Sequence, residues 1–195
     1  MWSRIKWWAR FKYLGAKAKP LATLAGTITS NAAICAESME NHLNFPTESE
    51  NELAKTKLLL EFTWAFIHIT SRYALGFLGP EKALPLLREL VRGTAWVFVD
   101  IYFGESPANL KEGMEADFLR GAAEREKEYG QCRDLLVEGK PFSDDAVLSR
   151  LAMRVAEVTG NKYNPGTISW AMWKTVRTLT DSRLNQLVEK ATKGF

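Results

Sequence analysis

The sequence has few of the residues that enzymes and metalloproteins use for chemistry. Among its 195 residues are two histidines, His42 and His68, and two cysteines, Cys35 and Cys132. Two cysteines in different halves of the chain do not make a disulfide framework, and neither has the CxxC or CxxH spacing of a zinc site. We therefore expect two free, buried thiols in a protein of a reducing compartment.

The motifs of common catalytic and cofactor sites are absent as well. There is no Glu-x-x-His pair, which a di-metal carboxylate site on bundle helices requires. There is no Gly-x-Ser-x-Gly nucleophile turn, no P-loop and no Gly-x-Gly-x-x-Gly dinucleotide motif. The sequence therefore predicts no catalytic residue, no metal ligand and no cofactor, and it favours a protein that acts by binding rather than as an enzyme.

No segment shows the alternation of apolar and polar residues that marks a β-strand, and no internal repeat is visible. Apolar residues instead recur every three or four positions along most of the chain. With 46% hydrophobic and 25% charged residues, the composition is that of an ordinary globular protein. We predict an all-α fold: a single-domain bundle of about six helices over residues 21–195, preceded by a separate segment over residues 1–20.

Capping residues, prolines and glycines indicate where the helices begin and end. Helices are expected over residues 21–43, 50–78, 80–104, 107–139, 143–160 and 167–191. Ser49 and Glu52 have the spacing of a capping box, which predicts the start of the second helix. The first helix carries one apolar stripe, formed by Leu21, Leu24, Ile28, Ala32, Cys35, Met39 and His42 or Leu43.

The helix over about 50–78 is apolar on nearly all sides and is the expected central helix. It is long enough to span a bilayer, but Glu61, His68 and Arg72 would be costly in lipid, so a buried helix of a soluble bundle is favoured. These three residues fall within a sector of roughly 60° around the helix. They form either the solvent-facing edge of a buried helix or an inner cleft, where the His–Arg pair would bind an anionic ligand that Glu61 orients.

The segment over residues 1–20 differs from the rest of the chain in charge. It contains no acid and six bases: Arg4, Lys6, Arg10, Lys12, Lys17 and Lys19. The overall net charge of +3 therefore leaves the remainder at −3. Three tryptophans, Trp2, Trp7 and Trp8, are interleaved with the bases. This composition favours contact with an anionic membrane surface or a protein partner, and less so with single-stranded nucleic acid. Alternatively, the tryptophans dock on the bundle and the bases stay solvated.

The start of the chain has the outline of a signal peptide, but its basic region is too long and its apolar stretch is interrupted, so we expect it to be retained. Residues 148–173 resemble a helix-turn-helix, in which Lys174 and Arg177 would contact DNA phosphates. The linker from Gly160 to Ile168 is long for that motif, so DNA binding is a second alternative. We expect a cytoplasmic protein, in a membrane-peripheral form if the leading hypothesis holds; self-association stays open.

Overall fold

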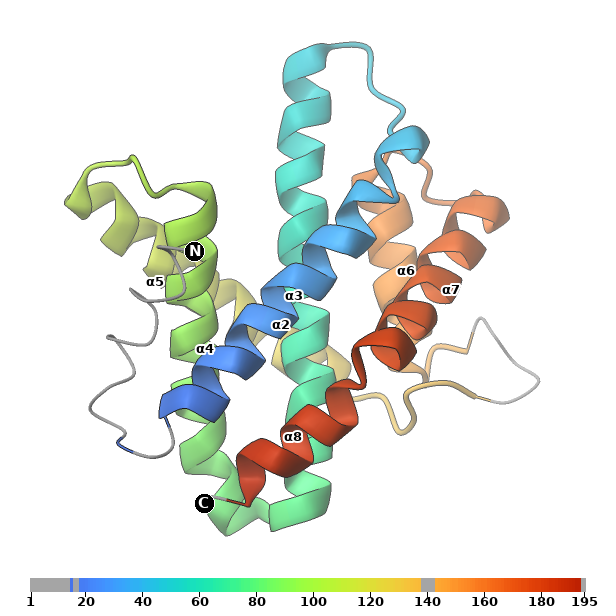
Figure 1. The fold of residues 1–195 in the computed structure, drawn as a ribbon. Helices are drawn as coiled ribbons and strands as arrows, with labels where there is room; N and C mark the ends of the chain where they lie inside the picture. Colours follow the sequence, from blue (N-terminus) through green and yellow to red (C-terminus); the bar gives the residue numbers. More distant parts are fainter. Residues whose placement is uncertain (1–14, 16–17, 138–142, 194–195) are drawn as a thin grey trace. The chain divides into compact units, whose positions relative to one another are not determined.

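The computed structural model describes residues 15, 18–137 and 143–193, and every regular element within these ranges is helical (Figure 1). The α-helices are α2 (Ala18–Glu37), α3 (Glu48–Leu78), α4 (Pro80–Tyr102), α5 (Ala108–Tyr129), α6 (Val147–Val158), α7 (Pro165–Ser182) and α8 (Leu184–Thr192). A short 3₁₀ turn, η2, covers Glu40–His42. The all-α prediction is confirmed, with seven α-helices in the described residues where about six were expected.

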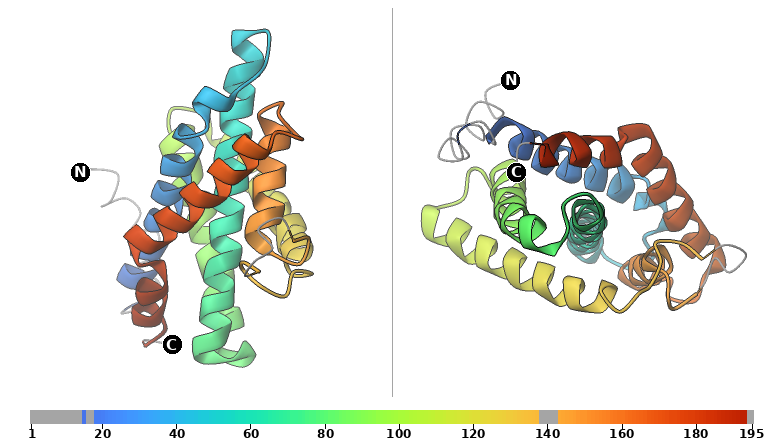
Figure 2. Two further views of the ribbon diagram at one scale, coloured as in Figure 1. Left: turned by 90° about the vertical axis from the view of Figure 1, so that its right-hand side faces the viewer. Right: turned by 90° about the horizontal axis from the view of Figure 1, so that it is seen from below.

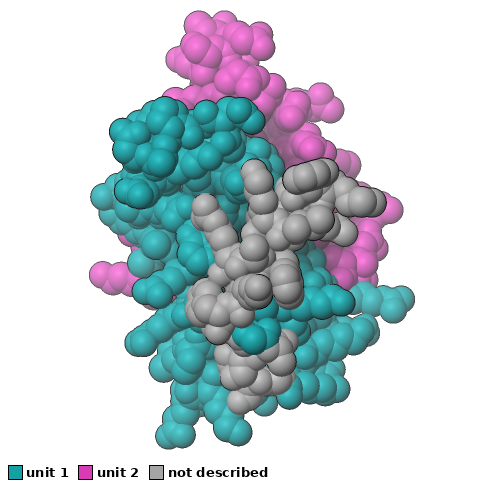
Figure 3. Space-filling model, turned by 60° about the vertical axis from the view of Figure 1, so that its left-hand side comes forward, with its two compact units in different colours: residues 1–29, 69–123, 183–195 teal, residues 30–68, 124–182 magenta. Residues whose placement is uncertain are grey.

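The chain forms two compact units, which Figure 3 distinguishes by colour. The first comprises residues 1–29, 69–123 and 183–195, and the second comprises residues 30–68 and 124–182. The boundary between the units falls inside α2, α3 and α5. The separation of residues 1–20 from a single domain over 21–195 stays a prediction, because Trp2 to Lys12 lie outside the described residues.

In the first unit, the end of α3 turns into α4 at Gly79. Gly79 has a φ of 71°, a left-handed conformation that glycine adopts without a Cβ clash. Pro80 follows at the first position of α4, where a missing backbone N–H costs nothing. Phe98 then forms the centre of an aromatic cluster, with ring centroids 5.0 Å from Tyr102 and 5.2 Å from Phe118.

In the second unit, the end of α2 lies antiparallel to α7, as both views of Figure 2 show. The Asn31 amide donates to the Ser182 hydroxyl at 3.0 Å, and the Trp170 indole donates to the Ser38 carbonyl at 3.1 Å. Between them, the Cys35 thiol donates to the Thr178 hydroxyl at 3.4 Å. Helix α6 packs on α7 and buries its apolar face, which is formed by Val147, Leu148, Leu151, Ala152 and Val155.

Helix α3 begins at Glu48, two residues before the predicted start at residue 50. Thr47 takes the capping position, because the Glu50 N–H donates to its hydroxyl at 3.3 Å. That hydroxyl in turn donates to the Glu50 carboxylate at 2.7 Å, so the side chains at the cap and three residues later contact each other. The capping box predicted at Ser49 and Glu52 is therefore wrong in register, although the helix it announced is present.

Other helix boundaries differ from the prediction as well. Helix α2 ends at Glu37 rather than near 43, and α6 begins at Val147 rather than near 143. Helix α5 ends at Tyr129 rather than near 139, and Gly130 follows it. The expected last helix is divided into α7 and α8 at Arg183, whose φ of 49° is left-handed. A non-glycine residue in this conformation costs roughly 1–2 kcal/mol, and the local sequence gives no signal for it.

The apolar stripe predicted over residues 21–43 is buried from Leu21 to Met39, whereas its last position, His42 or Leu43, is only half-buried. Cys35 and Cys132 are free and buried, as predicted. Burial raises the pKa of the Cys35 thiol to about 11. No helix in the described part of the chain, α3 included, combines the length and apolarity needed to cross a bilayer.

The core of the second unit can be tested by changing leucine to alanine at two positions of α3. Leu58 is fully buried, whereas Leu53 is 55% exposed. We expect Leu58→Ala to lower the free energy of unfolding by about 2–5 kcal/mol, and Leu53→Ala to change it by less than about 0.5 kcal/mol. Urea denaturation followed by circular dichroism measures both. Equal losses would mean that this part of α3 does not bury Leu58.

Cys35 should make the stability depend on pH in the alkaline range. Its thiol ionises near pH 9 in the unfolded chain but only near 11 in the folded one, so its contribution is fully present below pH 9 and is lost as the pH rises toward 11. The difference in unfolding free energy between wild type and Cys35→Ala should shrink by about 1.3 kcal/mol between pH 8 and pH 10. Urea titrations at both values measure it, and a constant difference would contradict the burial of this thiol.

Candidate functional site

The polar stripe of α3 lies against the last turns of α5 in the second unit. Both oxygens of Glu61 accept hydrogen bonds from the Arg125 guanidinium, from Nε at 2.7 Å and from Nη2. The guanidinium also lies over the Trp64 ring, 5.5 Å from its centroid. Two turns later, His68 Nδ1 is 2.9 Å from a Glu126 carboxylate oxygen. The stripe is therefore a helix–helix contact made by ion pairs and hydrogen bonds.

This contact corrects the interpretation of the stripe as a solvent-facing edge. Glu61 is 5% exposed and His68 is 3% exposed, because α5 covers them. Arg72, the third residue of the predicted ligand set, is half-buried and belongs to the first unit. The structure thus gives Glu61 and His68 protein partners on α5, and a ligand role for the three residues stays a prediction.

Arg125 is held in its charged form by this environment. The Glu61 carboxylate, which accepts two of its hydrogen bonds, raises the pKa of Arg125 further above its ordinary value and outweighs the opposing effect of burial. Next to it, burial raises the pKa of the Tyr129 hydroxyl, so this residue stays neutral. The Tyr129 ring packs against His68 at 5.6 Å between centroids.

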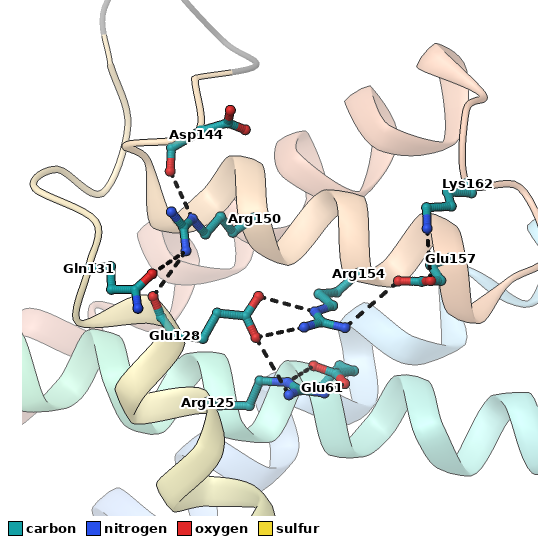
Figure 4. A network of polar contacts seen from close by, with 9 residues as sticks. All are labelled: Glu61, Arg125, Glu128, Gln131, Asp144, Arg150, Arg154, Glu157 and Lys162. Carbon is teal, nitrogen blue, oxygen red and sulfur yellow. Dashed lines mark hydrogen bonds and ion pairs between the residues drawn. The ribbon is translucent and has the colours of Figure 1, made fainter.

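From Arg125 a chain of alternating charges runs to the surface (Figure 4). Arg125 Nη1 is 3.5 Å from the Glu128 carboxylate, which Arg154 binds with two N–H groups at 3.1 and 2.9 Å. Arg154 Nη1 lies 3.8 Å from Glu157, and Lys162 Nζ lies 3.1 Å from it. Side-chain exposure rises along the chain from 7% at Glu61 to 55% at Lys162. The network thus connects a buried ion pair to solvent.

The outer part of this chain lines an open pocket of about 530 Å³. That volume is within the range of small-molecule sites. Four lining residues, Arg150, Met153, Arg154 and Glu157, share one face of α6 because they are spaced three or four positions apart. Glu128 comes from α5, Asp144 from the segment before α6, and Lys162, Tyr163 and Ile168 from the loop and first turn that lead into α7.

Arg150 differs from the other two cations of the pocket. Its guanidinium donates to the Asp144 carbonyl at 2.8 Å, the Glu128 carbonyl at 3.3 Å and the Gln131 side-chain oxygen at 3.2 Å. These acceptors are all neutral, and the Asp144 carboxylate points away from it (Figure 4). Among the described residues, no carboxylate forms an ion pair with Arg150 within 4.0 Å. Its positive charge therefore contributes to the potential of the pocket.

The helix-turn-helix prediction is centred on α6 and α7. The connection between them, residues 159–164, is longer than the three or four residues of that motif. Lys174 is half-buried. Arg177 is exposed, lies over the Trp173 ring at 5.4 Å and pairs with Asp181 at 3.6 Å. The two proposed phosphate contacts therefore differ in accessibility, and DNA binding stays a prediction.

Sequence reasoning found Glu61 and His68 but missed the pocket. Arg150, Arg154 and Glu157 have a readable signal, since they share the face of α6 opposite its apolar residues. Glu128 and Lys162 have none, because they reach that face from other elements. Among the described residues, no group of three or more His, Cys, Asp or Glu side chains is arranged to hold a metal ion.

A double-mutant cycle tests the buried ion pair. Glu61→Leu should destabilise the protein by about 3–5 kcal/mol, because it leaves the Arg125 guanidinium largely buried without its main partner. Glu61→Leu combined with Arg125→Leu should cost less than the single change. Urea denaturation measures both, and additive losses would show that the two residues do not interact.

The exposed pair Asp117–Arg120, on the same helix α5, is the control for this cycle. Both side chains are 70% exposed. The same leucine substitutions there should give a coupling energy below about 1 kcal/mol. A coupling as large as that of Glu61 and Arg125 would mean that burial does not strengthen the inner pair.

The second unit thus contains a charged pocket and a buried ion pair. A comparison of the chain with protein-family models, with curated proteins and with solved structures gave no match.

Proposed function

We propose that this chain is a non-enzymatic binding protein, which contacts an anionic membrane surface through the basic, tryptophan-rich segment over residues 1–20. The observation that carries the proposal is the separation of charge. The segment has six bases and no acid, whereas the remaining residues have a net charge of −3. An anionic surface attracts the segment and repels the remainder, so the charge distribution itself orients the protein.

The aromatic residues favour a membrane over a nucleic acid. Trp2, Trp7 and Trp8 are amphipathic indoles, and such side chains concentrate at the headgroup level of bilayers. Single-stranded nucleic acid would use the same residues for stacking, but it calls for a groove that follows the phosphate backbone. A protein partner with an acidic surface is the other occupant of this segment, and the experiment below separates it from lipid.

Ligand binding at Glu61, His68 and Arg72 and DNA binding by α7 are the alternative proposals. Both require contacts that compete with existing ones. A ligand of Glu61 would have to replace the Arg125 guanidinium, and a DNA phosphate at Arg177 would compete with Asp181. The segment over residues 1–20 contains no acid that would compete for its bases, and for this reason we place membrane binding first.

Vesicle sedimentation tests the proposal. A variant with Arg4, Lys6, Arg10 and Lys12 changed to glutamine should lose at least about 100-fold in affinity for vesicles of phosphatidylserine and phosphatidylcholine, since each base near an anionic surface contributes about 1 kcal/mol. Binding of the wild type should weaken as salt increases, because the attraction is screened. Wild-type protein that ignores these vesicles at low salt would contradict the proposal and leave a protein partner as the ligand of the segment.

A second variant with the same loss of charge is the control. Lys57, Lys82, Arg88 and Lys127 are exposed bases of the helices, and their change to glutamine removes four positive charges elsewhere. This variant should bind vesicles within about threefold of the wild type if local charge decides the interaction. An equal loss in both variants would show that only net charge matters.

A further inference from the structure

The pocket on α6 has the features of an anion-binding site in which a carboxylate of the protein itself occupies the place of the anion. The Glu157 carboxylate lies between two cations, 3.1 Å from Lys162 Nζ and 3.8 Å from Arg154 Nη1. It is 48% exposed and comes from the last turn of α6, so it can turn into solvent without disturbing the core. The Glu157 carboxylate also raises the pKa of Lys162, which keeps the lysine charged.

The other carboxylates of the pocket do not oppose an incoming anion strongly. Arg154 and Arg125 hold the Glu128 carboxylate, which neutralises its charge. Asp144 contributes its carbonyl to Arg150, and its carboxylate points away (Figure 4). Arg150 adds a positive charge that has only neutral acceptors among the described residues. With Glu157 turned outward, Lys162 and Arg150 would face the pocket without a paired carboxylate, and Arg154, still bound to Glu128, would present the Nη1 group that Glu157 now engages.

We infer that this pocket binds a small molecule carrying a phosphate or carboxylate group, and that Glu157 occupies the anion position until the ligand displaces it. The anion would be bound by Arg154 Nη1 and Lys162 Nζ, the two groups that Glu157 now engages. Met153, Ile168 and the Tyr163 ring also line the pocket, so an apolar group attached to the anion would have surface to contact. The inference is independent of membrane binding by residues 1–20.

Two substitutions of exposed residues give opposite predictions. Glu157→Gln removes the competing charge and should tighten binding of phenyl phosphate by about tenfold. Lys162→Gln removes a cation that would bind the anion, and it should weaken binding of phenyl phosphate by about tenfold. Isothermal titration calorimetry on the full chain measures both, with inorganic phosphate as a second probe that should bind more weakly because it lacks the apolar ring. Neither exposed side chain contributes to the core, so both variants should keep the wild-type fold.

Glu189 on α8 and Lys193, which follows that helix, form the matched control pair, with their charged atoms 3.0 Å apart at the surface. Glu189→Gln and Lys193→Gln make the same changes of charge away from the pocket and should leave phenyl phosphate binding unchanged. Equal changes in phenyl phosphate affinity at both pairs would show that only the net charge of the protein matters, and this result would overturn the inference. Absence of saturable binding by both wild type and Glu157→Gln would overturn it as well.

The phosphate group could also belong to a lipid headgroup, and a vesicle arm separates the two sources. We expect Glu157→Gln to leave sedimentation with phosphatidic acid vesicles unchanged, because the pocket is hollow and takes a free molecule. Increased sedimentation of this variant, without tighter phenyl phosphate binding, would overturn the soluble ligand in favour of a headgroup. Loss of vesicle binding on neutralising residues 4–12 does not affect this test, so the two proposals can fail separately.

Discussion

The Arg125 guanidinium sets the strongest constraint on the second unit. It is 16% exposed, and a charge in such a place is costly unless a carboxylate faces it with good geometry. Glu61 on α3 meets this need with two hydrogen bonds, and Trp64, one turn further, supplies the ring under the guanidinium. A shift of α5 along α3 by one turn would separate these groups. The pair therefore determines the register of the two helices, whatever its net contribution to stability.

The same stretch of α5 determines where the polar network reaches the surface. Arg125 and Glu126 contact residues of α3. Glu128 lies on another side of α5, and its carboxylate accepts hydrogen bonds from Arg154 of α6. Because Glu128 contacts both arginines, it links the buried pair to the pocket. Arg150 also donates to the Glu128 carbonyl in the last turn of α5, which accepts from the Gln131 backbone N–H as well. Helix α6 is thus positioned by two arginines that bind the same residue of α5.

The fold was largely predictable because its determinants are local. The spacing of Leu21, Ile28 and Cys35 predicts a buried face, and this face is buried. The confinement of Glu61 and His68 to one stripe is likewise a property of a single helix. Their partners are not: Arg125 follows Glu61 by 64 positions, and no periodicity relates the two. The sequence therefore reveals the stripe but leaves open whether solvent or a cleft lies beside it, because no local signal indicates the helix that covers it.

The pocket could not be predicted because its residues come from several elements that are distant in the sequence. Its affinity for an anion also depends on which charges lie close to the site. Outside residues 1–20 the chain is net negative, which argues against anion binding if charge is averaged over the molecule. Screening limits such averaging to about 8–10 Å at physiological salt, so an anion responds chiefly to the cations nearest to it. Within that range Glu157 is the one carboxylate of the pocket that both faces two cations and can move away from them. Affinity for an anion is then controlled by the position of one flexible side chain, a property that neither composition nor net charge expresses.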